Sequence, residues 1–585
     1  MSVSNSVDSS PHKSRREQQF CAHIDSIKKQ LQSGQLNEAK CIAAFDPILD
    51  TFRKSDSELL LCEICDLFLF VFSHENRSHF FDTRDLLQLL VTKLIVRQTS
   101  LKSQLKLLKC IKAILKVKES DFANINSNLV LSLVNKVNEQ QSARIVEKID
   151  SDNEDIMTEI SWSRVVLNTV RILKHIISGR KLENIEKLLN NILGFLKFYI
   201  FYGLPGYIVN KAHIGPLYAS HLNQYIPDEM ANSSPNEKKQ KSQKRRKQRK
   251  KKFGKNDDAD DREDEIDVLS SNEFNKGTTT PSDSEQSASE YVNQSPINLR
   301  PILKQSNAKI RINSYECLCC IVQQAEKKFI FGYWSSFIPD NSGVGTTEFS
   351  VLTSILKDPT LKARRIALCF LREMLISGKH FVLTLAEEKR NHSKHPFTTL
   401  SQTLASMITE IHRCFYLLLF AETNTDVLLQ ALKCMSTLIS VTPYNRFDSG
   451  LLTTLLNKSI CLLNCERQVQ NSCLALFITA FSLRPLPNEF VNWSNSEGNQ
   501  HIENLLNFCF EKTSSMESIV LCNESLTFLS TFLASNISHK SLSLTKVMNL
   551  AINISSHELA LINPVIQSNF FKNPRLGFKV HPNAL

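Results

Sequence analysis

The chain has 585 residues, with 70 Lys and Arg, 59 Asp and Glu and only 15 Gly. This length exceeds one compact core at roughly 150 residues per domain, so it indicates several domains or a repeat array. The low share of Gly, against an average of about 7%, argues against collagen-like, Gly-rich disordered and turn-rich all-β chains. The net charge of +11 comes entirely from residues 238–252, because the rest of the chain carries equal numbers of the two signs.

The sequence predicts a block of helices over residues 16–228. The polar segment 1–15 that precedes it is expected to be disordered. Apolar residues recur there at steps of three and four, the spacing of one helix face. The helices are expected at 16–33, 57–74, 83–96, 101–116, 158–178 and 182–199. Because no segment shows sustained period-two alternation between turn signals, we predict an all-α chain.

Two different segments follow this block. Residues 201–228 are rich in aromatic residues, Gly and Pro, and we expect an ordered loop that packs on the first block. Residues 229–298 form a charged linker, in which the basic run 238–252 precedes an acidic run, 257–267, and a stretch rich in Ser, Thr and Asn. Such a segment buries too little apolar surface to offset the entropy lost on ordering, so it is predicted to be disordered.

The linker holds the strongest short signal in the sequence. Its cations could bind an acidic groove of a nuclear import receptor, contact RNA phosphates, or simply solvate a spacer. They are Lys238, Lys239, Lys241, Lys244, Arg245, Arg246, Lys247, Arg249, Lys250, Lys251 and Lys252. Candidate phosphorylation sites follow at Thr280, Ser282, Ser287 and Ser295, which precede Pro or an acidic residue.

A second helical block is expected over residues 299–560, followed by a tail, 561–585. Residues 349–376 read as helix, Asp-Pro turn, helix. Asp358 is expected to cap the second helix, with Pro359 at its first position, where no N–H partner is lost. Small Ala residues on the apolar stripe of that helix would let neighbouring helices approach closely.

These residues resemble a HEAT repeat, whose turn and second helix commonly run Asp-Pro, Val-Arg and then Ala. Asp358, Pro359, Ala363, Arg364 and Ala367 match this pattern, and looser copies begin at Ile310, Val427 and Val469. The irregular spacing of the copies indicates insertions. The resemblance implies an α-α superhelix, a HEAT- or armadillo-like solenoid, in two blocks joined by the charged linker.

A more specific resemblance covers about residues 299–480. The segments KIRIN at Lys309 and GYWSSFIPD at Gly332 are similar to the uncharacterised helical domain of the HEAT repeat-containing protein 6 family. Members of that family are generally much longer, so the resemblance suggests a shortened form of a larger solenoid. It implies no catalytic residues.

Arg311, Arg364 and Arg365 are candidate residues of a partner-binding groove on the solenoid. Salt bridges between successive repeats would explain them equally well. Arrays of this kind also need a polar terminal cap, and the Pro-containing tail is a poor one, so the end of the array is expected to bind a missing region or a partner.

No residue pattern in the chain supports catalysis, a cofactor or a metal. The 16 Cys residues are scattered through apolar helical stretches, which is typical of reduced thiols in a nuclear or cytoplasmic protein. Cys62-x-x-Cys65 has no second ligand pair at zinc spacing, and His392 with His395 lies in a polar loop. Secretion and membrane insertion are not expected, because the chain has neither a signal peptide nor a long apolar run.

The sequence therefore predicts a non-enzymatic scaffold that binds protein partners through its solenoid surface. One alternative is an RNA-associated or ribosome-assembly factor anchored by the basic run. A second alternative is a solenoid of the nucleocytoplasmic transport-receptor type, and the basic run could in either case bind an import receptor.

Overall fold

The computed structural model describes most of the two predicted blocks. The described ranges are 15–33, 38–55, 57–73, 83–96, 100–117, 127–150, 155–179, 185–209, 213–219, 296–339, 349–388, 399–447, 450–515, 518–535 and 537. Several predicted features lie outside these ranges: the basic run, the candidate phosphorylation sites, His392, His395 and residues 538–585.

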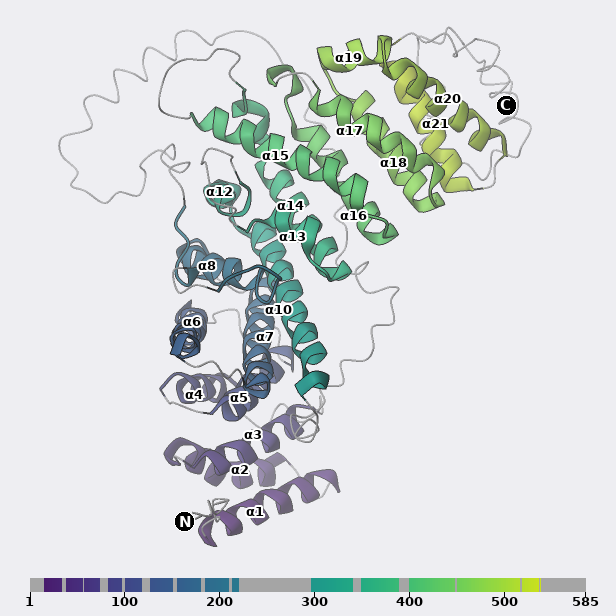
Figure 1. Cartoon of the computed structure of the whole chain (residues 1–585). Coiled ribbons are helices and arrows are strands. Elements are labelled where there is room, and N and C mark those ends of the chain that lie inside the picture. The colour runs from purple at the N-terminus through teal and green to yellow at the C-terminus, as the bar shows by residue number, and fades with distance from the viewer. Residues whose placement is uncertain are drawn as a thin grey trace, which may run out of the picture. The chain divides into compact units, whose positions relative to one another are not determined.

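The described residues form helices and connecting turns without any strand, which confirms the all-α prediction (Figure 1). The N-terminal block contains α1 (Arg15–Gln32), α2 (Glu38–Lys54), α3 (Glu58–Phe72), α4 (Thr83–Val96), α5 (Leu101–Val117), α6 (Ser127–Asp150), α7 (Ile156–Ser178) and α8 (Leu189–Tyr199). The C-terminal block contains α10 (Pro296–Gln324), α11 (Lys327–Phe331), α12 (Trp334–Phe337), α13 (Val351–Lys357), α14 (Leu361–Leu385), α15 (Leu400–Ala421), α16 (Thr425–Val441), α17 (Leu451–Ser459), α18 (Arg467–Phe481), α19 (Asn488–Asn495), α20 (Gly498–Ser515) and α21 (Ile519–Ala534).

Side chains at the helix starts explain several of these boundaries. Asp155 caps α7 by accepting a hydrogen bond from the N–H of Met157, at 3.0 Å. Thr399 and Gln402 form a reciprocal capping box at the start of α15, in which each side chain accepts from the other's backbone N–H. Local polar residues thus fix where the apolar stripes become helical.

The helices pack in two alternating series, as expected for a solenoid. In one series α1, α3, α5, α7, α10, α14, α16, α18 and α21 each pack against the next. In the other series α4, α6 and α8 pack in sequence, and so do α13, α15, α17 and α19. Contacts within each series build a continuous core, so the described part of the chain is an α-α superhelical solenoid.

The two blocks are joined within this stack by helix contacts. α10 packs against both α7 and α8, and the Ser163 hydroxyl donates a hydrogen bond to Asn307 Oδ1 at 2.9 Å. Lys174 of α7 forms an ion pair with Glu316 of α10 at 2.7 Å. The charged segment between Ala219 and Pro296 is therefore inserted between two successive steps of one helical stack.

The described residues of the segment after α8, 201–209 and 213–219, pack on both blocks. Residues 210–212 and 220–228 of the loop predicted here lie outside the described residues. Phe201, Tyr202 and Leu204 are buried beside α8, as the sequence predicted for this part of the chain. Phe201 and Tyr207 also contact the ring of Phe349, at centroid distances of 5.9 and 5.2 Å. Its aromatic residues therefore contribute to the junction between the blocks, a role that the sequence does not predict.

Gly194 allows this segment to lie directly on α8. A Cβ atom at Gly194 would lie 2.0 Å from the carbonyl oxygen of Gly215 and 2.8 Å from the amide nitrogen of Leu217. That same amide donates to the carbonyl of Asn190 at 2.7 Å. The close approach of two backbones thus requires Gly at this position.

Gly194→Ala should therefore destabilise the protein by about 1–3 kcal/mol, the usual cost of overpacking. The segment 213–219 would have to move, because both clashing atoms belong to the backbone. Thermal unfolding measures the loss, and hydrogen exchange at Leu217 localises it. Asn191→Ala, a partly exposed change on the same helix, is the control and should stay within about 0.5 kcal/mol. Equal stability of the two variants would contradict this account.

The apolar helix α15 belongs to the core of the solenoid. By length and composition alone it could cross a membrane, and 56% of its most apolar window is buried within the protein. It packs against α13, α14, α16 and α17. This burial explains its hydrophobicity without a membrane.

Cys62 and Cys65 lie inside the core of the first block, as predicted. The Cys62 sulfur contacts the Ser103 hydroxyl at 3.5 Å, and the Cys110 thiol donates to the carbonyl of Cys65 at 3.4 Å. Burial raises the pKa of the Cys62 thiol, and a side-chain hydrogen bond with Cys110, together with burial, raises the pKa of the Cys65 thiol. Both thiols therefore stay protonated at neutral pH and are poor nucleophiles.

Candidate functional site

Arg311 lies in the interior of the junction between the blocks. Its Nε and Nη2 donate to the two carboxylate oxygens of Asp358, at 2.7 and 2.9 Å, and its Nη1 donates to the carbonyl of Tyr202 at 3.0 Å. The side chains of Arg311 and Asp358 are 3% and 0% exposed. This bidentate pair occupies the full hydrogen-bonding capacity of one side of the guanidinium.

Arg364 continues the network towards α16. It donates to the carbonyl of Asp358 at 2.8 Å and pairs with both carboxylate oxygens of Glu422, at 2.9 and 3.3 Å. Glu422 in turn accepts the backbone N–H groups of Thr423 and Asn424, so it orders the turn between α15 and α16.

The network also extends back to the first block. Tyr202 donates from its hydroxyl to Glu159 at 3.5 Å, and Glu159 of α7 pairs with Arg144 of α6. We call the connected residues the ion-pair ladder: Arg144, Glu159, Tyr202, Arg311, Asp358, Arg364 and Glu422. Charged and polar groups thus connect α6, α7, α10 and α14 with the turn between α15 and α16.

Two sequence-based expectations are corrected by the ion-pair ladder. Arg311 and Arg364 face partners within the stack, so they are not residues of an accessible groove. Asp358 does not cap α14, because that helix starts at Leu361 with Thr360 as its N-cap. Asp358 instead accepts the N–H of Thr360 at 2.8 Å while its carboxylate holds Arg311.

Arg365 lies on a different face of α14 and belongs to a cationic surface. Arg365 and Arg372 of α14 and Lys433 of α16 all lie close enough to Cys369 to oppose the rise in its pKa. Burial raises that pKa to about 11, and Glu373 is the acidic group that adds to the rise. Within the described chain none of the three cations forms an ion pair. We call Arg365, Arg372 and Lys433 the cationic face.

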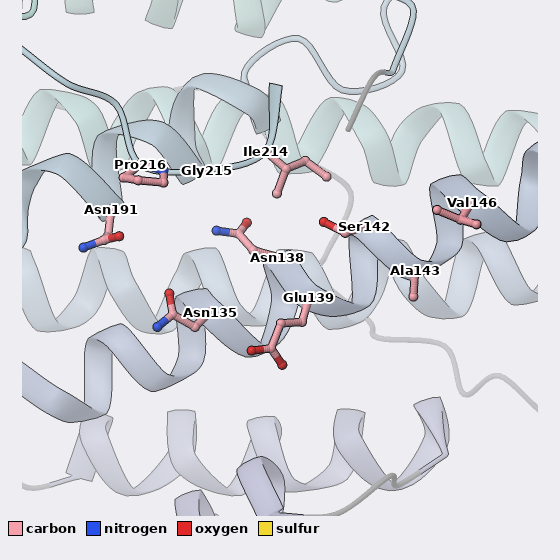
Figure 2. Close-up of a pocket in the computed structure, with 10 residues that line it drawn as sticks. All are labelled: Asn135, Asn138, Glu139, Ser142, Ala143, Val146, Asn191, Ile214, Gly215 and Pro216. Atoms are coloured by element: carbon pink, nitrogen blue, oxygen red, sulfur yellow. The ribbon is translucent and has the colours of Figure 1, made fainter. Parts of the chain in front are cut away.

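A groove lined by both polar and apolar residues lies between α6, α8 and the segment 213–219 (Figure 2). Its volume is about 500 Å³, and it is shallow and broadly open to solvent. The residues that line it are Asn135, Asn138, Glu139, Ser142, Ala143, Val146, Asn191, Ile214, Gly215 and Pro216. Neither α6 nor this groove is among the features predicted from the sequence. Scattered amides form no recognisable motif, so the sequence contains no signal for the groove.

Comparisons with known proteins give a domain but no activity. Residues 309–488 match a family model described as a domain of unknown function, DUF4042. A putative uncharacterised protein of Dictyostelium discoideum is 26% identical over 239 residues, which is 34% of this chain and 15% of that protein. The crystal structure of an engineered protein aligns over 91% of this chain and 99% of its own, at 10% identity and a TM-score of 0.38. At that TM-score the alignment supports no conclusion.

Proposed function

We propose that the protein is a non-enzymatic scaffold whose cationic face binds an acidic segment of a protein partner. The observation that carries this proposal is the grouping of Arg365, Arg372 and Lys433 on two adjacent helices, with Glu373 as the acidic group beside them. Unpaired cations on a rigid helical surface attract acidic segments and speed their association. The stacked helices hold these side chains on rigid elements, which favours binding.

Charge reversal on the cationic face should abolish this binding. We expect Arg365→Glu with Lys433→Glu to reduce recovery of the acidic partners at least tenfold, while helicity remains unchanged. Lys362→Glu is the matched control, because Lys362 is exposed on the same helix and has no part in the cationic face. Arg364 is unsuitable for this test, because its removal would leave Glu422 buried and unpaired.

Co-purification from cells, quantified by mass spectrometry, measures this effect for the full chain and both variants. Proteins that are retained by Lys362→Glu and lost with the double variant support the scaffold proposal. Identical partner sets for the wild type and the double variant would reject it.

The RNA-associated alternative makes a different prediction. Partners held through the basic run should disappear on ribonuclease treatment or on deletion of residues 238–252, and their binding should fall steeply with salt. The transport alternative predicts binding that responds to a small nuclear GTPase. Both can be scored in the same experiment.

We also propose that the solenoid is of the HEAT type and related to the HEAT repeat-containing protein 6 family. The matched domain, residues 309–488, overlaps the segment 299–480 that carries the resemblance. The pairing of Asp358 with Arg311, and of Arg364 with Glu422, supports a repeat whose turn charges connect neighbouring units.

A further inference from the structure

We propose that the groove between α6 and α8 binds an extended peptide that carries a basic side chain. The groove is separate from the cationic face and has the opposite charge, because Glu139 is the one charged residue among those that line it. The inference therefore concerns a second site and a second class of partner.

The amide groups of the groove are free to bind a ligand. The side chains of Asn135, Asn138, Asn191 and Ser142 make no hydrogen bond to any residue that the structure describes, and none of the four is fully buried. A side-chain amide offers two N–H donors and a carbonyl acceptor, which match the alternating C=O and N–H groups of an extended peptide. Figure 2 shows Asn138, Ser142 and Ile214 directed towards the same space between α6 and the segment that follows α8.

The dimensions of the groove suit a short extended segment. Asn135, Asn138, Ser142 and Val146 follow one another along one face of α6 at steps of three, four and four. The helix rises 1.5 Å per residue, so this row is about 16 Å long. An extended chain rises about 3.3 Å per residue, and about five of its residues would cover the row.

Apolar and charged residues add selectivity to this arrangement. Val146 is 45% exposed, and it lies with Ile214 and Pro216 among the lining residues. These groups can accept an apolar side chain or the methylene stem of a Lys or Arg. Glu139 is also among the lining residues, and its carboxylate can pair with the cationic end.

The groove is also rigidly built. Its upper wall is fixed by the hydrogen bond from the N–H of Leu217 to the carbonyl of Asn190 and by the close backbone contact at Gly194. The side chain of Asn190 accepts a hydrogen bond from the hydroxyl of Tyr333 in the second block. A preformed groove loses little conformational entropy when a peptide binds.

Phage display of random heptapeptides on the full-length protein tests this proposal. The most enriched peptide is synthesised with a fluorescent label, and its affinity is measured by anisotropy. We expect the enriched peptides to contain Lys or Arg. Binding to the Asn138→Ala and Asn191→Ala double variant should be at least tenfold weaker, and Glu139→Lys should remove the preference for basic residues.

Three controls make the outcome specific. Gln323→Ala removes an exposed amide on α10 and should leave binding unchanged. Unchanged thermal unfolding of the double variant shows that it is folded. A version of the peptide with N-methylated backbone amides should bind at least tenfold more weakly, because the groove is expected to recognise the main chain.

The proposal would be overturned by enriched peptides that bind the double variant as well as the wild type, or by equal binding of the N-methylated form. Failure to enrich any peptide that depends on Asn138 would also overturn it. The variant with a reversed cationic face should bind the peptide normally, so this result is independent of the proposed scaffold function.

Discussion

Arg311→Met should destabilise the protein by about 3–5 kcal/mol, because it leaves the carboxylate of Asp358 buried without its counter-charge. The Asp358 side chain is completely buried, and the carbonyl of Tyr202 loses a donor in the same variant. The loss should lower the unfolding temperature. Hydrogen exchange should show it first in α10 and in the first turn of α14.

A double-mutant cycle separates the ion pair from general packing. Asp358→Asn combined with Arg311→Met should be less destabilising than the sum of the single variants, since neither charge then remains unpaired. Arg413→Met is the control, because its side chain is 69% exposed and lies 3.8 Å from Glu410. With its Arg exposed to solvent and 3.8 Å between the charged atoms, this pair contributes at most about 1 kcal/mol. Equal losses for Arg311→Met and Arg413→Met would show that the buried pair has no special role.

The fold could be predicted because the evidence for it is periodic and local. The apolar stripes at 16–33, 83–96, 101–116 and 158–178 each coincide with a helix to within two residues, since steps of three and four directly report a helix face. The helix expected at 182–199 is only partly correct. The structure has a 3-10 turn at Ile185–Lys187 and starts α8 at Leu189. A 3-10 turn also places residues three apart on one side, so the pattern could not distinguish the two.

The roles of the charged residues could not be predicted in the same way. The sequence motif identified Arg311 and Arg364, and it could not choose between a groove and a salt bridge. The choice depends on contacts between residues that are far apart in the chain. Arg311 binds Asp358, which is 47 residues away, and the carbonyl of Tyr202, which is 109 residues away. The groove beside α6 depends on a similarly distant contact, because Gly215 reaches α8 through the space left at Gly194. Spacing along one helix gives no information about either.

A buried His provides the second large effect, a loss of stability in acid. His412 of α15 is 2% exposed, and its Nδ1–H donates to the carbonyl of Ile408 at 2.8 Å. Its Nε2 therefore accepts from the hydroxyl of Tyr444 at 3.0 Å. Protonation of Nε2 would force this second bond to reverse its direction and would place a positive charge in the core. Burial accordingly lowers the pKa of His412 from 6.5 to about 4.

The direction of the pH dependence follows from this shift. Between pH 6.5 and pH 4 the unfolded chain binds a proton at His412 and the folded chain does not, so the free energy of unfolding falls as the pH is lowered. For a shift of this size the loss is about 3 kcal/mol once the pH is below 4. At pH 7 the His412 ring is mostly neutral in both the folded and the unfolded chain, so His412 contributes little to the pH dependence there.

Unfolding measured from pH 7.5 to pH 4 should show this loss in the wild type and a shallower decline in His412→Gln. The Gln side chain cannot take up the proton, although the variant should be less stable at pH 7 because it fits the two hydrogen-bond partners less well. His380→Gln is the matched control, since His380 is exposed on α14 and should leave the slope unchanged. The decisive comparison is the slope between pH 6.5 and pH 4. If His412→Gln retains the wild-type slope, the acid sensitivity arises from other groups and the buried His412 is not its source.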